Sequence, residues 1–138
     1  MSPEITPEVE RIAEVMSWSY VAGFFDGEGC IHYADRAYGR YVHMNVSQGV
    51  VNEANSRVLA GIWLFLRRHG VSVRWASYSG RTVNDKGGYK VIATNAPALV
   101  AWLTGMMPHL IVKRSAAESA VAFAASIGKR KLDKRVAA

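Results

Sequence analysis

Two acidic residues end an apolar stretch near the start of the chain, and carboxylates at this spacing can bind a metal ion. The stretch Ser17–Cys30 reads SWSYVAGFFDGEGC and carries the acids at Asp26 and Glu28. Its glycines suit a helix stop, but the acids lie near the negative end of the helix dipole, which disfavours them by a few tenths of a kcal/mol each. A calcium loop of the EF-hand type is excluded, because Ile31 would replace its glycine and Ala37 its glutamate.

Composition predicts one compact domain with a polyanionic partner. The chain has 138 residues, is 50% hydrophobic and has a formal net charge of +6, which favours nucleic acid or an anionic membrane surface. Its single cysteine excludes an internal disulfide framework, and no apolar run reaches the roughly 18 residues of a membrane span. The N-terminus lacks the basic start of a signal peptide. We therefore expect an intracellular protein that is not secreted and has no membrane partner.

Hydrophobic periodicity predicts helices that alternate with two hairpins. Helical spacing is expected over residues 6–16, 17–25, 55–69, 95–107 and 113–127. Strand-like alternation occupies residues 29–36 and 40–48, then 71–76 and 89–94, with turns at 37–39 and 79–88. The final residues, 129–138, form a basic tail, which we expect to be either a solvated, frayed end or an arm that binds phosphates.

Each predicted hairpin has one polar and one apolar face. The fold class is therefore α+β, with one four-stranded antiparallel sheet whose apolar face is covered by helices. The other face is predicted to present His32, Arg36, Tyr41, His43, Asn45, Arg74 and Lys90. Nucleic-acid grooves admit a β-ribbon and expose donors and acceptors on base edges, so this face suits DNA. An ordinary solvated sheet face is the alternative that the pattern leaves open.

The stretch Val21–Gly29, VAGFFDGEG, resembles the LAGLIDADG motif of homing endonucleases at every position, allowing apolar and Asp/Glu exchanges. The resemblance extends to the order of elements from about residue 20 to residue 127. It implies the αββαββα homing-endonuclease fold with a saddle-shaped sheet. It also implies a site-specific endonuclease for double-stranded DNA, of a kind typically encoded within a mobile intron or intein. A non-cleaving nucleic-acid-binding protein of the same fold, an intron maturase or a transcriptional regulator, is the alternative.

Three active-site residues follow from the resemblance. Glu28, the last acid of the motif, would bind a divalent metal, and we expect Mg²⁺ because all the ligands are oxygen atoms. Gln48 would orient the attacking water, and Lys113 would stabilise charge on the phosphate. Without the resemblance, Lys113 would be taken for a solvated lysine in the first turn of a helix. Asp26 is expected to hold the motif turn together, and no small-molecule cofactor is implied.

One position departs from the family pattern. A basic residue often lies a few positions beyond the glutamine, whereas this chain reads GVVNEANSR from residue 49 to residue 57. Asn52 and Arg57 are the candidates for completing the pocket.

The motif occurs once, because the similar stretch Leu59–Ile62 continues without a carboxylate or a glycine stop. One motif in a single domain, residues 1–128, implies a homodimer whose motif helices pack through small residues, here Ala22 and Gly23. Two-fold symmetry then implies a long, pseudo-palindromic target. Phosphate contacts are expected from the basic tail and from Arg81 and Lys86 in the second hairpin loop.

Overall fold

The computed structural model describes residues 1–37, 39–50, 53–84 and 86–137, with side chains up to residue 127. The elements are α1 (Pro7–Val15), α2 (Trp18–Glu28), β1 (Gly29–Arg36), β2 (Gly39–Gly49), α3 (Glu53–Arg68), β3 (Val73–Tyr78), β4 (Gly88–Ala93), α4 (Ala96–Met106), the 3₁₀ turn η1 (Met107–His109) and α5 (Arg114–Ala137). The predicted alternation of helices and hairpins is confirmed.

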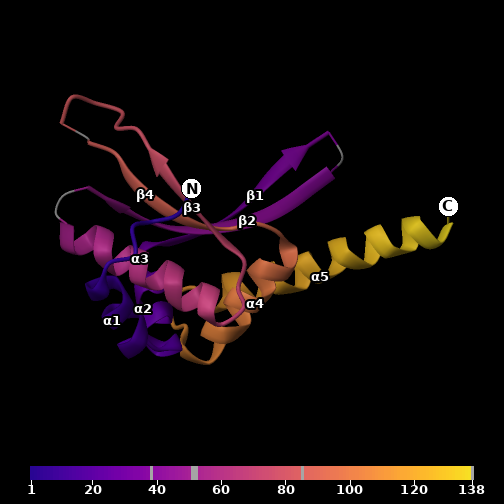
Figure 1. The fold of residues 1–138 in the computed structure, drawn as a ribbon. Helices are drawn as coiled ribbons and strands as arrows, with labels where there is room; N and C mark the ends of the chain where they lie inside the picture. Colours follow the sequence, from indigo (N-terminus) through magenta and orange to yellow (C-terminus); the bar gives the residue numbers. More distant parts are fainter. Residues whose placement is uncertain (38, 51–52, 85, 138) are drawn as a thin grey trace.

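The four strands form one antiparallel sheet in the order β1-β2-β4-β3. The two hairpins join along β2 and β4, which pair from Asn45 with Ile92 to Gly49 with Gly88. A Cβ at position 88 would lie 2.1 Å from the carbonyl oxygen of Gln48, so glycine permits this close approach. All helices lie on one side of the sheet, and the hairpins diverge on the other (Figure 1). The predicted α+β class with a saddle-shaped sheet is therefore confirmed.

The core lies between the sheet and the helices, and it fixes α2 against both. Met44, Val46 and Val91 enter it from the sheet, each at most 1% exposed. On α2 the ring of Phe25 meets the indole of Trp102 edge to face, with centroids 5.9 Å apart. Complete burial of an aromatic side chain such as Phe25 stabilises the fold by about 1.5 to 3 kcal/mol. The position of α2 is therefore set by packing.

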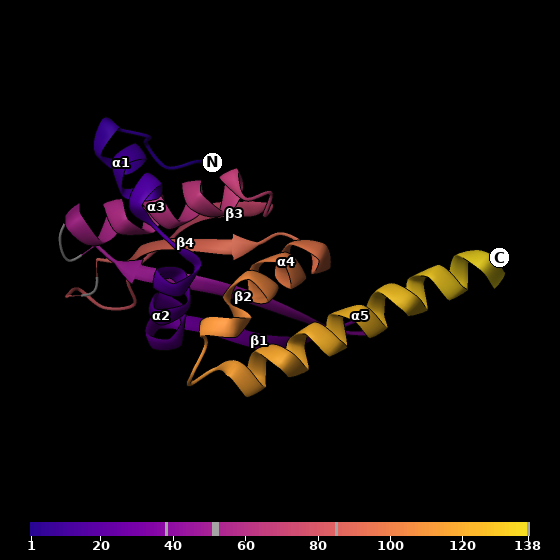
Figure 2. The same ribbon diagram turned by 90° about the horizontal axis from the view of Figure 1, so that it is seen from below.

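The N-terminal helix α1 packs on α3, as Figure 2 shows. Its start follows the predicted signal, because the Thr6 hydroxyl accepts a hydrogen bond from the Val9 amide at 3.2 Å and Pro7 occupies the first turn. Val9 and Ala13 are buried. A Cβ at Gly61 of α3 would lie 2.5 Å from Ile12, so a glycine is needed where the two helices approach.

Two helices are longer than the sequence analysis predicted. Helix α2 continues through Glu28, because the chain leaves the helix only at Gly29, whose amide donates to the carbonyl of Phe25. Helix α5 runs to Ala137 instead of ending at residue 127. Good helix formers in the basic stretch outweigh the cost of one glycine, which is about 1 kcal/mol. The expected frayed tail is thus helical in its backbone up to residue 137. The side chains predicted to bind phosphates there lie outside the described part.

Candidate active site and nucleic-acid interface

Glu28 lies where a helix passes directly into the sheet. The next residue, Gly29, already belongs to β1 and pairs with Val46 of β2. A Cβ at position 29 would lie 2.3 Å from the ring of Phe25, so the chain can turn this closely against the core only with glycine. Packing of Phe25 on one side and strand pairing on the other therefore fix the backbone that carries Glu28.

Asp26 binds backbone amides. Its carboxylate oxygens accept hydrogen bonds from the amides of Ile111 at 2.8 Å and Lys113 at 2.9 Å. Burial alone would raise the pKa of Asp26, but hydrogen bonds from the amides of residues 111–113 and the charge of Lys113 lower it below its ordinary value. Asp26 is thus a carboxylate with a structural role, but its hydrogen bonds hold the segment before α5 and not the motif turn for which it was predicted.

The Glu28 carboxylate, two residues later, is exposed and forms no hydrogen bond or ion pair with any described residue. Its oxygen atoms are therefore available to a cation, and a hard cation such as Mg²⁺ suits them. No three His, Cys, Asp or Glu side chains of the described part converge as a metal site. A cation at Glu28 would thus need further ligands from water, from a phosphate or from a second copy of the chain.

Lys113 reaches the same end of α2 from a distant part of the sequence. Its ammonium group donates a hydrogen bond of 2.5 Å to the carbonyl oxygen of Asp26, and it lies 6.0 Å from the centroid of the Phe25 ring. The carbonyls in the last turn of a helix lack partners within the helix and carry partial negative charge. The lysine therefore satisfies a helix end in this structure and stands beside the acidic residues.

Gln48 lies at the same junction by strand register. It follows Val46 by two residues, and Val46 pairs with Gly29, the residue after Glu28. Alternation along β2 directs Gln48 to the side of Met44 and Val46, which is the helix-covered side. Three segments, the end of α2, the end of β2 and the start of α5, thus bring the three predicted active-site residues to one corner of the fold.

Arg57 does not belong to this corner. Its guanidinium contacts Glu8 of α1 at 2.6 Å and Glu53 of its own helix at 2.8 Å, and hydrogen bonds to Glu53 and Glu8 raise its pKa. In this structure the charge of Arg57 therefore joins α1 to α3, and no hydrogen bond or ion pair links it to Glu28, Gln48 or Lys113 among the described residues. The other candidate, Asn52, lies outside the described residues.

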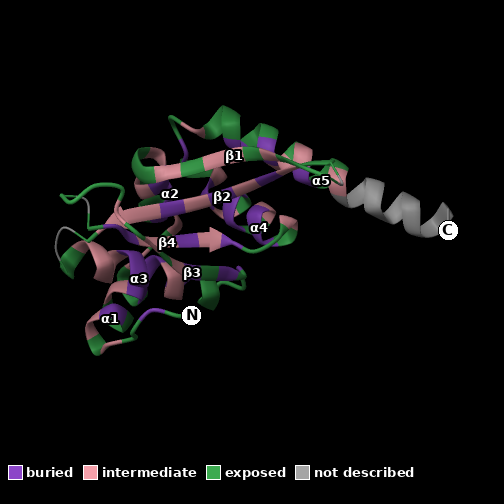
Figure 3. Ribbon diagram, turned by 90° about the horizontal axis from the view of Figure 1, so that it is seen from above, coloured by how far each residue is buried: buried purple, intermediate pink, exposed green. Residues whose placement is uncertain are grey.

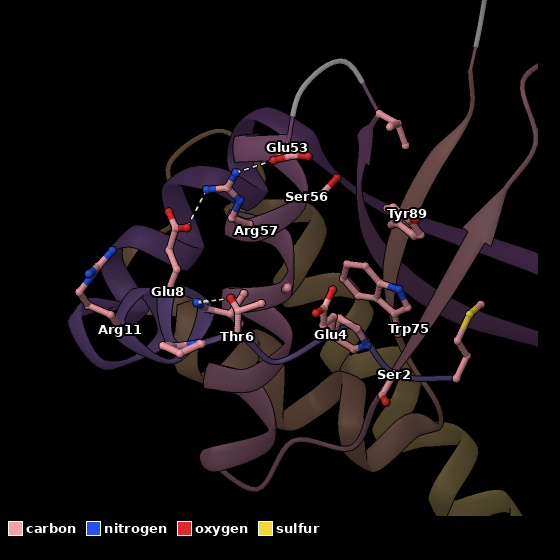
Figure 4. Close-up of a pocket in the computed structure, with 16 residues that line it drawn as sticks. Ser2, Glu4, Thr6, Glu8, Arg11, Glu53, Ser56, Arg57, Trp75 and Tyr89 are labelled. Carbon is pink, nitrogen blue, oxygen red and sulfur yellow. Dashed lines mark hydrogen bonds and ion pairs between the residues drawn. The ribbon is translucent and has the colours of Figure 1, made fainter.

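A groove of about 1170 Å³ lies beside this ion pair (Figure 4). Its lining comes from the N-terminal segment, α1, α3 and the strands, and it includes Arg57, Trp75 and Tyr89. Neither Glu28, Gln48 nor Lys113 lines it. The groove is therefore separate from the unpaired carboxylate of Glu28 and from Lys113.

The uncovered face of the sheet carries every side chain predicted for it. Residues directly opposite one another in an antiparallel ladder point to the same side. His32 pairs with His43, Asn45 with Ile92, and Ile92 with Arg74. The alternation places Arg36, Tyr41 and Lys90 on the same side. Figure 3 views this side of the sheet from above, with the strands coloured by burial. The register also adds Ser47 of β2 and Tyr78 of β3. Both could have been identified by continuing the alternation to the end of each strand.

Several of these side chains contact one another. The rings of His32 and His43 lie 3.4 Å apart between centroids, and Tyr41 stacks on His43 at 5.5 Å. Arg36 donates from Nε to the Tyr41 hydroxyl at 2.8 Å. Burial lowers the pKa of His43, and so do the positive charges of His32, Arg36 and Lys90. The face therefore gathers cations and rings that an anionic partner would stabilise.

Comparisons with solved structures address the fold directly. The homing endonuclease I-CvuI in complex with its target Sro1.3, in the presence of 2 mM Ca, matches with a TM-score of 0.59 and 21% identity, over 90% of this chain and 71% of that one. I-CvuI with the I-CreI target C1221 in 2 mM Mg, where the DNA is not cleaved, matches with a TM-score of 0.51 and 20% identity, over 76% and 63%. The chain has the homing-endonuclease fold. No protein-family model and no curated protein matches the sequence.

Within this homing-endonuclease fold, the predicted contact residues between copies need one correction. Ala22 is 0% exposed and packs in the core of its own chain, so it is not available to a second copy. Gly23 is exposed, together with Gly27 and with Tyr20, which is 48% exposed. Positions three, four and seven apart share one face of a helix. Tyr20 and Gly27 were not predicted to lie on this exposed face, although the same spacing identifies them.

The loop residues Arg81 and Lys86 are exposed between β3 and β4, at the outer end of the second hairpin. This position leaves them accessible from the uncovered side of the sheet. Every helix in the described part of the chain is too short or too polar to cross a membrane.

Proposed function

We propose that the chain is a metal-dependent, site-specific endonuclease that cleaves double-stranded DNA as a homodimer. The observation that carries the proposal is the contrast between two carboxylates on one turn of α2. Asp26 is occupied by backbone amides, whereas Glu28 is exposed without a partner in the described part. An unpaired carboxylate at a helix C-terminus costs stability, so a function as metal ligand explains why it is there.

Hydrolysis of a phosphodiester requires an attacking water, a stabilised phosphate and a leaving oxygen that can carry charge. When bound, a divalent metal lowers the pKa of water and neutralises charge on the leaving oxygen. Glu28 would hold the metal through its free carboxylate, and Gln48 would orient the water by hydrogen bonding. Lys113 would exchange its hydrogen bond with the Asp26 carbonyl for one with a phosphate oxygen, where a donor stabilises the transition state.

A second copy supplies what one chain lacks. Cleavage of both strands needs two sites, and each chain offers one Glu28. We infer that two α2 helices pack through the face formed by Tyr20, Gly23 and Gly27, because an added Cβ at either glycine would meet no atom within 4 Å in its own chain. Such a pairing would place both Glu28 residues near the two-fold axis and the two sheets side by side.

The strand lengths predict the size of the target. At about 3.3 Å per residue, the eight residues of β1 span about 26 Å and the eleven of β2 about 36 Å. At 3.4 Å per base pair, each half-site covers roughly 8 to 11 base pairs and two copies cover roughly 16 to 22. The face that carries His32, Asn45 and Arg74 would read base edges, while Arg81 and Lys86 would contact phosphates.

A cleavage selection tests the proposal. The unaltered protein is incubated with a randomised double-stranded library in Mg²⁺ or in a chelator, and cleaved products are sequenced. We expect products only with metal, a pseudo-palindromic consensus, and none with Glu28→Gln. Binding to a consensus site without cleavage in any divalent metal would support the alternative, a non-cleaving DNA-binding protein.

A further inference from the structure

Lys113 occupies a position at which a lysine is unfavourable by local rules. Its carbonyl accepts the first hydrogen bond of α5, from the amide of Ala117 at 2.8 Å, which makes it the N-cap residue of that helix. N-cap residues are usually Ser, Thr, Asp or Asn, whose side-chain oxygens accept from the first free amides. A lysine has no acceptor and adds positive charge at the positive end of the helix.

Asp26 of α2 supplies the hydrogen-bond acceptor that the Lys113 side chain lacks. Its carboxylate accepts from the amides of Ile111 and Lys113, which lie 85 and 87 residues later in the sequence. In return, the Lys113 ammonium donates to the carbonyl of Asp26 at the negative end of α2. The Asp26 carboxylate thus stabilises the positive end of α5, where Lys113 lies. The Lys113 ammonium stabilises the negative end of α2, where Asp26 lies.

The segment depends on these hydrogen bonds because little else holds it. Leu110 is buried, at 2% exposed, but Ile111 and Val112 are 85% and 76% exposed. Among the described residues, the Asp26 carboxylate therefore provides the only side-chain hydrogen bonds to the backbone between the buried Leu110 and the start of α5. A carboxylate has two acceptor oxygens that can serve two amides at once, whereas an amide side chain would point an NH₂ at one of them.

We propose that Asp26 is a positioning residue for Lys113: its carboxylate fixes the backbone from which the ammonium reaches the corner that holds Glu28. This inference rests on the proposed function, because it assigns Lys113 to the same reaction. Asp26 itself touches neither metal nor DNA, and it acts only through the lysine.

Single-turnover cleavage of the selected site tests the coupling. Lys113→Met removes a donor to the transition state, and such losses slow reactions by about 10²- to 10³-fold. We expect Asp26→Asn to slow cleavage by about 10- to 100-fold, and the double variant to be no slower than Lys113→Met alone. Residues that act as one unit are non-additive. Glu118→Gln, an exposed acid on α5 that pairs with Arg114, is the matched control and should cleave at the unaltered rate.

The results separate the inference from the proposed function. If the unaltered protein cleaves no DNA, or Glu28→Gln cleaves normally, the proposed function is wrong. If the unaltered protein cleaves and Glu28→Gln does not, but Asp26→Asn cleaves at full rate, or its loss multiplies with that of Lys113→Met, the positioning role is wrong. The DNA affinity of Asp26→Asn, measured in Ca²⁺, should match that of the unaltered protein within about threefold, since this change removes no DNA contact.

Amide exchange gives a readout that requires no variant to fold. In the unaltered protein, the Ile111 and Lys113 amides should exchange more slowly than unprotected amides do, because they donate to Asp26 at 2.8 and 2.9 Å. Equal exchange at neutral pH would overturn the inference even without kinetic data.

Discussion

Gly23 offers the sharpest test of the proposed dimer, because the structure predicts opposite effects on one chain and on two. Glycine inside a helix is less favourable than alanine or leucine by about 0.5 to 1 kcal/mol. An added Cβ at position 23 meets nothing within 4 Å. In an isolated chain, Gly23→Leu should therefore raise the free energy of unfolding by about 0.5 to 1 kcal/mol, since nothing in the chain opposes the new side chain.

Between two copies the same change should be costly. A two-fold interface contains the residue twice, and insertion of a large side chain into a close contact costs about 1 to 3 kcal/mol. The loss per dimer is then about 2 to 6 kcal/mol, which weakens dimerisation by roughly 30- to 20,000-fold at 1.4 kcal/mol per tenfold. Cleavage of both strands should fall with it.

Sedimentation over a range of protein concentrations measures dimerisation, and denaturant unfolding of the monomer measures its free energy of unfolding. The unaltered protein should sediment as about twice 15.1 kDa at micromolar concentration, while Gly23→Leu should be a more stable monomer. Glu14→Leu, which adds the same side chain at an exposed position of α1, should leave dimerisation unchanged. A Gly23→Leu protein that dimerises and cleaves like the unaltered one would refute the assigned interface.

Three further predictions concern the site and the sheet. Glu28→Gln should abolish cleavage while DNA affinity stays within about tenfold, because it removes a metal ligand and no base contact; gel-shift and cleavage assays measure both. Asn45→Ala and Arg74→Ala should each relax base preference at particular positions by about 1 to 3 kcal/mol, and profiling over a degenerate site library checks this. Charge and burial lower the pKa of His43 in the free protein, and DNA phosphates should raise it, so affinity should increase from pH 8 to pH 6 and His43→Gln should reduce this dependence.

Alternation and register explain why the sheet was predictable from sequence. Successive side chains of a strand point to opposite faces of the sheet, so one correct register assigns every side chain to its face. His32, Asn45 and Arg74 were placed together from three strands, and the observed pairing agrees. The junction of Glu28, Gln48 and Lys113 followed from resemblance instead, because no local pattern links residues 85 positions apart.

Sequence alone does not determine which small residues of α2 face the core and which face outwards. Ala22 and Gly23 are both small, and a motif that calls for small residues does not tell them apart. They differ by about 100° around the helix, which directs Ala22 into the core beside Phe25 and leaves Gly23 in the open. The choice between them depends on where the sheet and α4 lie, and that information comes from tertiary packing.

The effect of Asp26 on stability should depend on pH, in a direction that the geometry fixes. Its folded-state pKa lies below the ordinary aspartate value near 4. A group of this kind contributes stability above its unfolded pKa and loses it as the pH falls through the folded one. Urea unfolding of the unaltered protein and of Asp26→Asn should therefore differ more at pH 7 than at pH 3. If the difference were the same at both pH values, the Asp26 charge would not stabilise the segment that carries Lys113.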